Sequence, residues 1–205
     1  MKIHNGWLNN VTHIPSPHYD ERPVNTIPSL LVIHNISLPP GQFGGPYINQ
    51  LFTGTLNPNE HPFFNEIKHL RVSAHCLIRR DGTIIQYVPF HLRAWHAGQS
   101  SYQGQEKCND FSIGIELEGT DFEPFTEVQY QSLTYLTNLL IIEYPLIKNN
   151  ITGHSNIAPG RKTDPGPFFD WVYYKNKLNN NWVIAPGNIY LDLTREYKTG
   201  TFIFT

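Results

Sequence analysis

Short apolar runs recur along the chain, and each one is bounded by proline, glycine or another residue that favours turns. Ser29 to Ile36 and Phe111 to Leu117 have the length and the β-branched content of buried strands. Val72 to Arg80 and Thr83 to Pro89 are two further runs, joined by Asp81-Gly82, a dipeptide typical of tight hairpins. The pattern therefore predicts a sheet that contains at least one hairpin.

Helical spacing of apolar residues appears farther along the chain. Thr126 and Gln129 have the spacing of a capping box, and leucines follow at helical intervals to about Tyr144, just before a proline. Phe168 to Leu178 has the pattern of a final amphipathic helix, and Asn150 to His154 that of one more short strand. Strands and helices interleave, which is typical of an α/β fold.

This order of elements predicts a single domain in residues 1–178, with a mixed central β-sheet flanked by helices. Residues 11–28 are rich in proline and predict an extended arm. Leu38 to Pro62 is rich in glycine and proline and predicts irregular structure, with a short helical turn around Tyr47 to Phe52. Residues 179–205 change in character, and we expect them to form a C-terminal extension of unknown role.

The segment from Gly153 to Pro167, GHSNIAPGRKTDPGP, is predicted to be a stiff loop that is too irregular for a helix. Prolines fix the backbone φ angle and glycines allow turns that other residues resist, so such a loop can hold side chains at fixed angles. It contains His154, Lys162 and Asp164. Loops on a rigid scaffold often carry function, and we therefore expect a site here.

Composition limits the partners that the chain can bind. Its 205 residues are 40% hydrophobic and 16% charged, which is enough for one compact body with a full core. The net charge of −2 gives no broad attraction to nucleic acid or to an acidic membrane surface. We expect neither as a partner, and a monomer is the favoured oligomeric state.

Cysteine content and the N-terminus indicate the compartment. Cys76 and Cys108 are the only cysteines and form no CxxC pair, which suits a reducing environment. The N-terminal MKIHNGWLNN lacks the apolar core of a signal peptide. The longest largely apolar run, Leu133 to Ile142, is far shorter than the ~20 residues that span a bilayer. These features predict a cytoplasmic protein.

Histidine is frequent, with 10 residues in the chain, which raises the prospect of a metal site. Catalytic zinc takes three protein ligands and leaves the fourth position for water. His154 and Asp164 share the stiff loop, and His34, near the end of a predicted strand, is the best candidate for the third ligand. Zinc on these ligands would lower the pKa of a bound water to about 7. His75 and His96 stay open as alternative ligands on chemistry alone.

Amide hydrolysis would also need a base for the water and a cation or donor for the oxyanion. Lys162 lies two residues before Asp164 and is the candidate cation. Strand alternation in FSIGIELE places Glu116 and Glu118 on the same face, as candidate bases. Alternation does not choose between these two carboxylates.

Five blocks of sequence carry a resemblance to a known family. They are PSLLVIHNISLPPGQFGGPYI, LRVSAHCLIRRDGTIIQYVPF, RAWHAGQSSYQG, CNDFSIGIELEGTD and TGHSNIAPGRKTDPGP. From about Gly6 to Leu178 the chain resembles the zinc N-acetylmuramoyl-L-alanine amidases, a family shared with phage-type lysozyme amidases and peptidoglycan recognition proteins. Within the family it is most similar to the branch that acts in cytosolic murein recycling. The resemblance implies a mixed β-sheet flanked by helices.

The resemblance also implies residue roles and a reaction. The family's zinc ligands fall on the three residues selected above, with one Zn²⁺ per chain. Its acid/base carboxylate falls on Glu116 rather than Glu118, and its oxyanion-stabilising lysine falls on Lys162. The implied reaction is hydrolysis of the amide between the lactyl group of 1,6-anhydro-N-acetylmuramic acid and L-alanine of the stem peptide. The partner is then a small muropeptide.

Substrate contacts are implied at four more positions. Asn35 and Trp95 would line the sugar and lactyl end, and Arg71 and Lys107 would pair with carboxylates of the peptide. Two other functions compete with the recycling amidase: a lytic amidase that cuts polymeric peptidoglycan, and a module that binds muropeptide without cleaving it. The lack of a signal peptide and of a wall-binding repeat disfavours the first, and the complete set of metal and catalytic residues disfavours the second.

Overall fold

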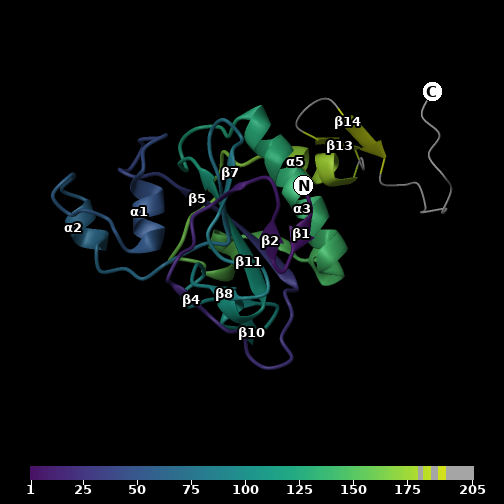
Figure 1. Cartoon of the computed structure of the whole chain (residues 1–205), viewed down its shortest axis with the longest axis horizontal. Helices are drawn as coiled ribbons and strands as arrows, with labels where there is room; N and C mark the ends of the chain where they lie inside the picture. The colour runs from purple at the N-terminus through teal and green to yellow at the C-terminus, as the bar shows by residue number, and fades with distance from the viewer. Residues whose placement is uncertain (180–181, 186–188, 193–205) are drawn as a thin grey trace.

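The computed structural model describes residues 1–179, 182–185 and 189–192. Its centre is a six-stranded mixed sheet with the strand order β12-β5-β11-β6-β7-β3 (Figure 1). Four neighbouring strands run parallel, namely β12 (Ile151–Gly153), β5 (Leu30–Ile36), β11 (Ser112–Glu118) and β6 (Cys76–Ile78). Antiparallel to β6 runs β7 (Ile84–Gln86), and the edge strand β3 (Thr12–His13) is parallel to β7. The predicted α/β fold with a mixed central sheet is confirmed.

The predicted hairpin joins β6 to β7 through Asp81-Gly82. Gly82 has φ +84°, a conformation that side chains resist, and the Thr83 N–H donates to the Asp81 side chain over 2.9 Å. The paired segments are shorter than the predicted runs, because only Cys76–Ile78 and Ile84–Gln86 form the ladder.

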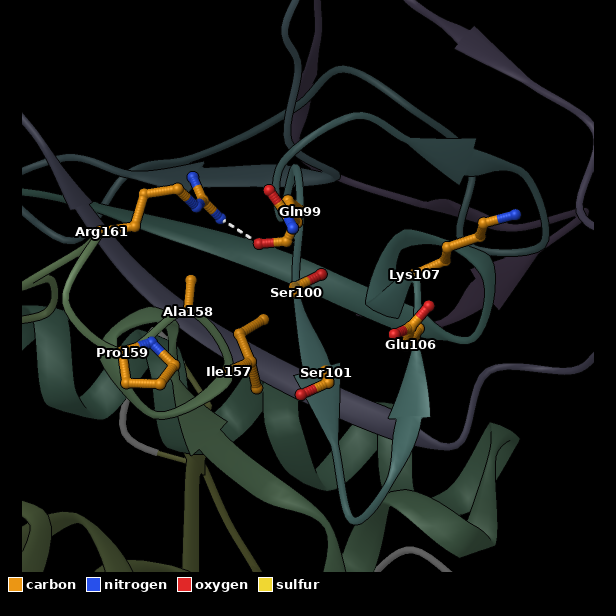
Figure 2. A pocket seen from close by; sticks show the side chains of 9 residues that line it. All are labelled: Gln99, Ser100, Ser101, Glu106, Lys107, Ile157, Ala158, Pro159 and Arg161. Carbon is orange, nitrogen blue, oxygen red and sulfur yellow. Dashed lines mark hydrogen bonds between the residues drawn. The ribbon is translucent and has the colours of Figure 1, made fainter.

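One face of the sheet, called here the first face, carries Leu30, Val32, Leu77 and Ile85. One half of this face is covered by α1 (Tyr47–Thr53) and α2 (Phe64–Ile67), whose apolar side chains pack with Leu77 and Ile85. The other half, over Leu30 and Val32, is covered by Ala97, Cys108 and Ile157. Figure 2 shows the segment 157–161, which includes Ile157, beside the segment 99–107, which lies between Ala97 and Cys108 in the sequence. The first face therefore carries separate apolar patches rather than one continuous layer.

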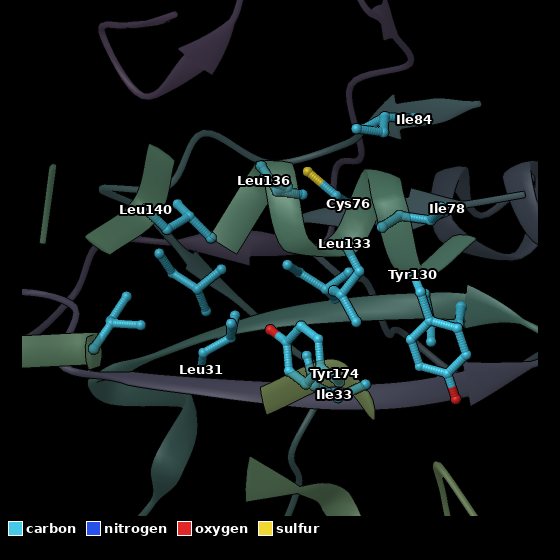
Figure 3. Close-up of a cluster of buried hydrophobic side chains, with 14 of the residues drawn as sticks. Leu31, Ile33, Cys76, Ile78, Ile84, Tyr130, Leu133, Leu136, Leu140 and Tyr174 are labelled. Carbon is cyan, nitrogen blue, oxygen red and sulfur yellow. The ribbon is translucent and has the colours of Figure 1, made fainter. Parts of the chain in front are cut away.

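The opposite face is closed by α3 (Glu127–Glu143) and α5 (Trp171–Asn179). Leucines of α3 and Tyr174 of α5 pack on Leu31 and Ile33 of the sheet (Figure 3). Each fully buried side chain of this size contributes roughly 1.5–3 kcal/mol. The predicted capping box is present: Thr126 Oγ1 accepts from the Gln129 N–H, and Gln129 Oε1 accepts from the Thr126 N–H.

Several short elements complete the described chain. They are β1 (Ile3–His4), β2 (Trp7–Leu8), β4 (Tyr19–Asp20), β8 (Arg93–Ala94), β9 (Ser101–Tyr102), β10 (Gln105–Glu106) and the 3₁₀ turns Cys108–Asp110 and Pro145–Asn149. The arm predicted for residues 11–28 is therefore partly wrong, because β3 and β4 within it pair with β7 and β8. Edge pairing needs only two residues in each case, too few to leave a pattern in the sequence.

The stiff loop also differs from its prediction in one respect. Its first residues, His154–Ile157, form the one-turn helix α4 directly after β12. The Ser155 N–H donates to the Asp164 carbonyl over 2.9 Å, so a contact from farther along the chain supports this turn. The remainder, Ala158 to Pro167, is irregular as expected.

The predicted extension of residues 179–205 lies largely outside the described residues. Within it, β13 (Trp182–Ala185) and β14 (Ile189–Asp192) form an antiparallel pair. The domain boundary after residue 178 stays a prediction. Within the described residues, none of the helices has the length and apolar character needed to cross a membrane.

Candidate active site

Three neighbouring parallel strands deliver three functional side chains to one place. In the β11–β5 register Glu116 is opposite His34, and in the β12–β5 register Gly153 is opposite Ile33, so His154 follows just beyond. Parallel strands expose their carboxyl ends along the same edge, where loops can add further groups. The sheet therefore aligns His34 and Glu116 with His154, the residue that directly follows β12.

Asp164 joins this edge from the stiff loop. Its Oδ2 lies 3.0 Å from Nδ1 of His34 and 3.0 Å from Nδ1 of His154, and the two Nδ1 atoms are themselves 3.0 Å apart. The backbone hydrogen bond between Ser155 and Asp164 folds the loop back onto α4 and so brings this carboxylate to the histidines. The three predicted metal ligands are thus brought together, although they come from distant parts of the sequence.

The three atoms that converge, Nδ1 of His34, Nδ1 of His154 and Oδ2 of Asp164, have the spacing that a zinc ion needs. In a tetrahedral site with bonds of about 2.0–2.2 Å, ligand atoms lie about 3.3 Å apart. His154 Nε2 lies 3.1 Å from the Ala97 carbonyl and donates to it, so in the neutral ring Nδ1 carries a lone pair that faces His34 and Asp164. Two nitrogens and one carboxylate oxygen, facing one another in a buried place, form a group that could hold a metal ion.

The electrostatics of the cluster follow from burial and from these contacts. Burial lowers the pKa of His34 to about 4, although Asp164 acts in the opposite direction. Burial alone would raise the pKa of Asp164, but its close contacts with His154 and His34 outweigh burial and hold that pKa well below its usual range. At neutral pH the cluster therefore pairs a neutral His34 ring with an ionised Asp164 carboxylate, and metal binding requires both of these forms.

Glu116 and Glu118 have different surroundings, although they share a face of β11. Glu118 is 1% exposed and forms an ion pair of 2.7 Å with Arg79, and it also accepts from the Gly44 and Arg80 N–H groups. The Oε2 atom of Glu116 is buried without a hydrogen-bond partner among the described residues. Burial, and then the charge of Asp164, raise the pKa of Glu116 well above its ordinary value. Of the two carboxylates, Glu116 is therefore the one that is available to exchange a proton with a substrate or a water.

A groove of about 640 Å³ opens on the cluster, and Asp164, Lys162 and Asn35 line it. Lys162 is exposed, and its positive charge acts on Glu116 against the effect of burial. The Asn35 amide donates to Asp121 Oδ1 over 2.7 Å, which fixes its orientation at the groove wall. Two residues that the sequence predicted to act in catalysis or substrate binding, Lys162 and Asn35, thus line this groove.

A second groove of about 600 Å³ continues past Arg161, and Lys107 lines it (Figure 2). Arg161 borders both grooves and is held by donating to the carbonyls of Ala97 and Gln99, each over 2.6 Å. Sequence reasoning did not select Arg161, and its position beside Lys162 in the stiff loop is the only signal that could have found it.

The other two predicted substrate contacts lie elsewhere. Trp95 is half-buried, its indole N–H donates to Asp20 over 3.0 Å and its ring stacks on His18, so these contacts fix the ring. Arg71 is exposed and is not one of the described residues that line either groove. The four predicted contacts therefore do not converge on one wall in this structure.

The alternative ligands His75 and His96 lie behind the cluster rather than in it. Nδ1 of His96 is 2.9 Å from Nε2 of His34, on the side of the ring away from Asp164. His75 accepts at Nδ1 from the Gly114 N–H over 3.0 Å and donates at Nε2 to the Leu92 carbonyl over 3.1 Å. His96 thus contacts a predicted ligand, and His75 serves the backbone.

Comparison with known proteins identifies the family of the chain. The sequence profile of the N-acetylmuramoyl-L-alanine amidase family matches residues 23–167. The chain is 67% identical over 175 residues to 1,6-anhydro-N-acetylmuramyl-L-alanine amidase AmpD of Citrobacter freundii, covering 85% of this chain and 94% of that one.

Two solved structures extend the comparison. A crystal structure of a selenomethionine AmpD derivative superposes with a TM-score of 0.86 at 66% identity, over 87% of this chain and 99% of that one. AMPDH3 from Pseudomonas aeruginosa, solved in complex with anhydromuramic pentapeptide, superposes with a TM-score of 0.56 at 27% identity, over 73% of this chain and 59% of that one. With the sequence match over most of the chain and the shared fold, this protein belongs to the N-acetylmuramoyl-L-alanine amidase family.

Proposed function

We propose that this protein is a zinc-dependent amidase that cuts the amide between 1,6-anhydro-N-acetylmuramic acid and the L-alanine of the stem peptide. The observation that carries the proposal is the convergence of His34, His154 and Asp164, whose ligand atoms all lie within 4.8 Å of one another, on the edge that also holds Glu116. The choice of bond and sugar is supported by the AmpD relative, which matches over nearly its full length.

The metal would be held by Nδ1 of His34, Nδ1 of His154 and Oδ2 of Asp164. When bound, zinc supplies a Lewis acid that polarises the amide carbonyl and makes water a better nucleophile at neutral pH. The neutral His34 ring and the ionised Asp164 carboxylate can bind the ion without first losing a proton. The affinity of the site then depends mainly on how well the two rings are oriented.

Glu116 is the proposed proton carrier. Its unpaired Oε2 takes a proton from the attacking water, and the same carboxyl then gives a proton to the leaving nitrogen of L-alanine. The products are a carboxylic acid on the lactyl group and a free amine on the peptide, so atoms and charges balance. A raised pKa favours both halves of this exchange, because a general base works best with a pKa near the working pH.

Lys162 is the proposed oxyanion donor. It lies in the groove that opens on Asp164, and its side chain is exposed and free to meet a substrate carbonyl. A cation aimed at the oxygen that becomes negative lowers the barrier, because the charge develops only as the reaction proceeds. This role requires Lys162 to act on the substrate and not on the metal.

The two grooves support a substrate of small size. Their volumes, about 640 and 600 Å³, lie in the range typical of sites for small ligands. We infer that Asn35 meets the sugar and lactyl end and Lys107 the peptide carboxylates, with Trp95 and Arg71 reached only by the ends of the ligand. The proposed setting is cytoplasmic murein recycling, with residues 1–178 as the amidase domain and residues 179–205 as a C-terminal extension of unknown role.

Substrate choice separates this proposal from a lytic amidase. Purified protein would be given a defined anhydromuropeptide and, in parallel, intact sacculi, and products would be followed by mass spectrometry. Rapid release of free stem peptide from the soluble substrate supports the recycling role. Preferential turnover of sacculi would overturn it and favour the lytic alternative, while binding without any cleavage would favour the non-catalytic one.

A further inference from the structure

We propose that the segment 95–97 positions both metal-binding histidines, and that the His96 side chain is the acceptor that orients His34. The inference rests on the proposed metal centre and adds residues that are not ligands themselves. Its basis is that two consecutive residues provide one hydrogen-bond acceptor for each histidine ring: the side chain of His96 and the backbone carbonyl of Ala97.

His34 supplies the first half of the argument. Its Nδ1 faces His154 and Asp164, so in a metal-loaded site this nitrogen carries the lone pair and Nε2 carries the proton. The atom that Nε2 meets is Nδ1 of His96, 2.9 Å away, and the two rings are nearly perpendicular at 87°. His96 must then accept at Nδ1, and its own proton lies on Nε2, 3.1 Å from Ser112 Oγ.

His154 supplies the second half. Its Nδ1 also faces the centre, and its Nε2–H donates to the Ala97 carbonyl over 3.1 Å. A ligand histidine whose outer N–H is held in this way keeps one tautomer and one ring orientation. The segment therefore selects Nδ1 as the metal-facing nitrogen in both rings at once.

The segment is itself fixed in place. Oδ1 of Asn109 accepts from the N–H groups of His96 and Ala97, over 3.1 and 2.8 Å. The Ser73 hydroxyl accepts from the Trp95 N–H over 3.1 Å, and the Ser73 N–H donates to the Trp95 carbonyl over the same distance. The acceptors are thus anchored by bonds on both sides and do not depend on the ligand histidines for their position.

Gly114 of β11 provides the space for the His96 ring. A Cβ placed on this glycine would lie 2.4 Å from Cγ of His96, far inside contact distance. Gly114 is two residues before Glu116 and therefore lies on the same face of β11 as the site. The His75 ring is adjacent, and its centroid lies 5.8 Å from the centroid of the His96 ring. The two nitrogens of His75, however, form hydrogen bonds with the backbone of Gly114 and Leu92. His75 therefore binds backbone groups, whereas His96 contacts the side chain of His34.

Two measurements test the proposal. One is zinc affinity, determined by competition with a chromophoric chelator, and the other is the rise in Tm that zinc causes. His96→Leu removes the acceptor and is expected to weaken zinc binding by roughly 10–100-fold. His96→Asn keeps an acceptor near the position of Nδ1 and is expected to regain most of that loss. A purely structural role would lower the Tm of both variants without separating their zinc affinities, and equal affinities in the two variants would overturn the proposal.

A measurement on the unmodified protein avoids any failure of the variants to fold. Imidazole ¹⁵N chemical shifts of the zinc-loaded wild type report the tautomer of each ring. We expect His34 and His96 both to carry the proton on Nε2, and a proton on Nδ1 of His96 would overturn the proposal. Wild type that binds no zinc would instead contradict the proposed function, so the two failures are distinguishable.

Discussion

Glu116 and His34 are direct partners in the register of β11 and β5, two parallel strands at the middle of the sheet. Their side chains emerge on the same face, because the neighbouring positions Ile115 and Ile33 are buried against the opposite layer. A slip of one residue would exchange the two faces and place an isoleucine at the site. The packing that stabilises the fold therefore also sets the distance between the base and the metal ligand.

Replacing the candidate base should stop the chemistry without removing the metal. Glu116→Gln is expected to lower kcat by roughly 10²–10⁴-fold, because the amide cannot take a proton from water. Zinc content should stay at one ion per chain, since Glu116 is not among the three converging ligand atoms. Steady-state kinetics with a defined muropeptide and metal analysis of the same sample provide the check. A variant with near-normal kcat would remove Glu116 from the mechanism.

The same substitution should stabilise the metal-free protein, by an amount that grows as pH rises. The pKa of Glu116 is raised in the folded state, above an ordinary value of 4.5, so the folded protein holds this proton more tightly than the unfolded chain. Its stability therefore declines as pH rises from about 4.5 through the raised pKa. Glu116→Gln lacks this loss, and its Tm should exceed that of wild type at pH 8 and match it at pH 4. Equal Tm differences at both pH values would contradict the assignment.

Glu118→Gln should have the opposite effect. Glu118 is paired with Arg79 in a buried ion pair, and removing one partner leaves the other charge uncompensated. We expect a loss of about 3–5 kcal/mol in the free energy of unfolding, measured by urea denaturation. The residual folded fraction should still bind zinc. A neutral effect on stability would show that the two carboxylates of β11 are not divided between structure and chemistry.

Lys162→Ala should separate turnover from metal binding. The lysine faces the groove and is not one of the converging ligands, so zinc affinity should stay within a factor of about two by the same chelator competition. Loss of an oxyanion donor typically costs about 10²–10³ in kcat. Lys162→Arg is the matched control, since it keeps the charge and should retain more activity than alanine. Loss of zinc in Lys162→Ala would mean that the lysine supports the metal site instead.

Much of the architecture could be predicted from local pattern. The strand Leu30–Ile36 and the helix Glu127–Glu143 are confirmed because each combines an apolar period with clear boundaries, a proline in one case and a capping box in the other. The one-turn helix at His154–Ile157 was missed, because its support comes from the backbone of Asp164. Short pairings such as β3 with β7 were missed for the same reason: their energy lies in tertiary contacts.

In the candidate site too, some features follow from the local sequence and others depend on tertiary contacts. His34, His154 and Asp164 could be selected by chemistry and by resemblance, and the fold brings them together. The different surroundings of Glu116 and Glu118 do not follow from alternation, since both lie on one face and only Glu118 has Arg79 beside it. The position of His96 behind His34 could not be predicted, because it depends on the space left by a glycine on a distant strand.

The most direct test of the account measures zinc content and reaction products on the same preparations. Wild type should contain one zinc per chain and should convert a defined 1,6-anhydro-N-acetylmuramyl peptide into anhydro-N-acetylmuramic acid and an intact peptide that begins with L-alanine. Asp164→Ala, which removes one of the three converging ligand atoms, should lose zinc and this activity together. Unchanged hydrolysis by metal-free Asp164→Ala protein, or cleavage at any other bond by wild type, would contradict the account.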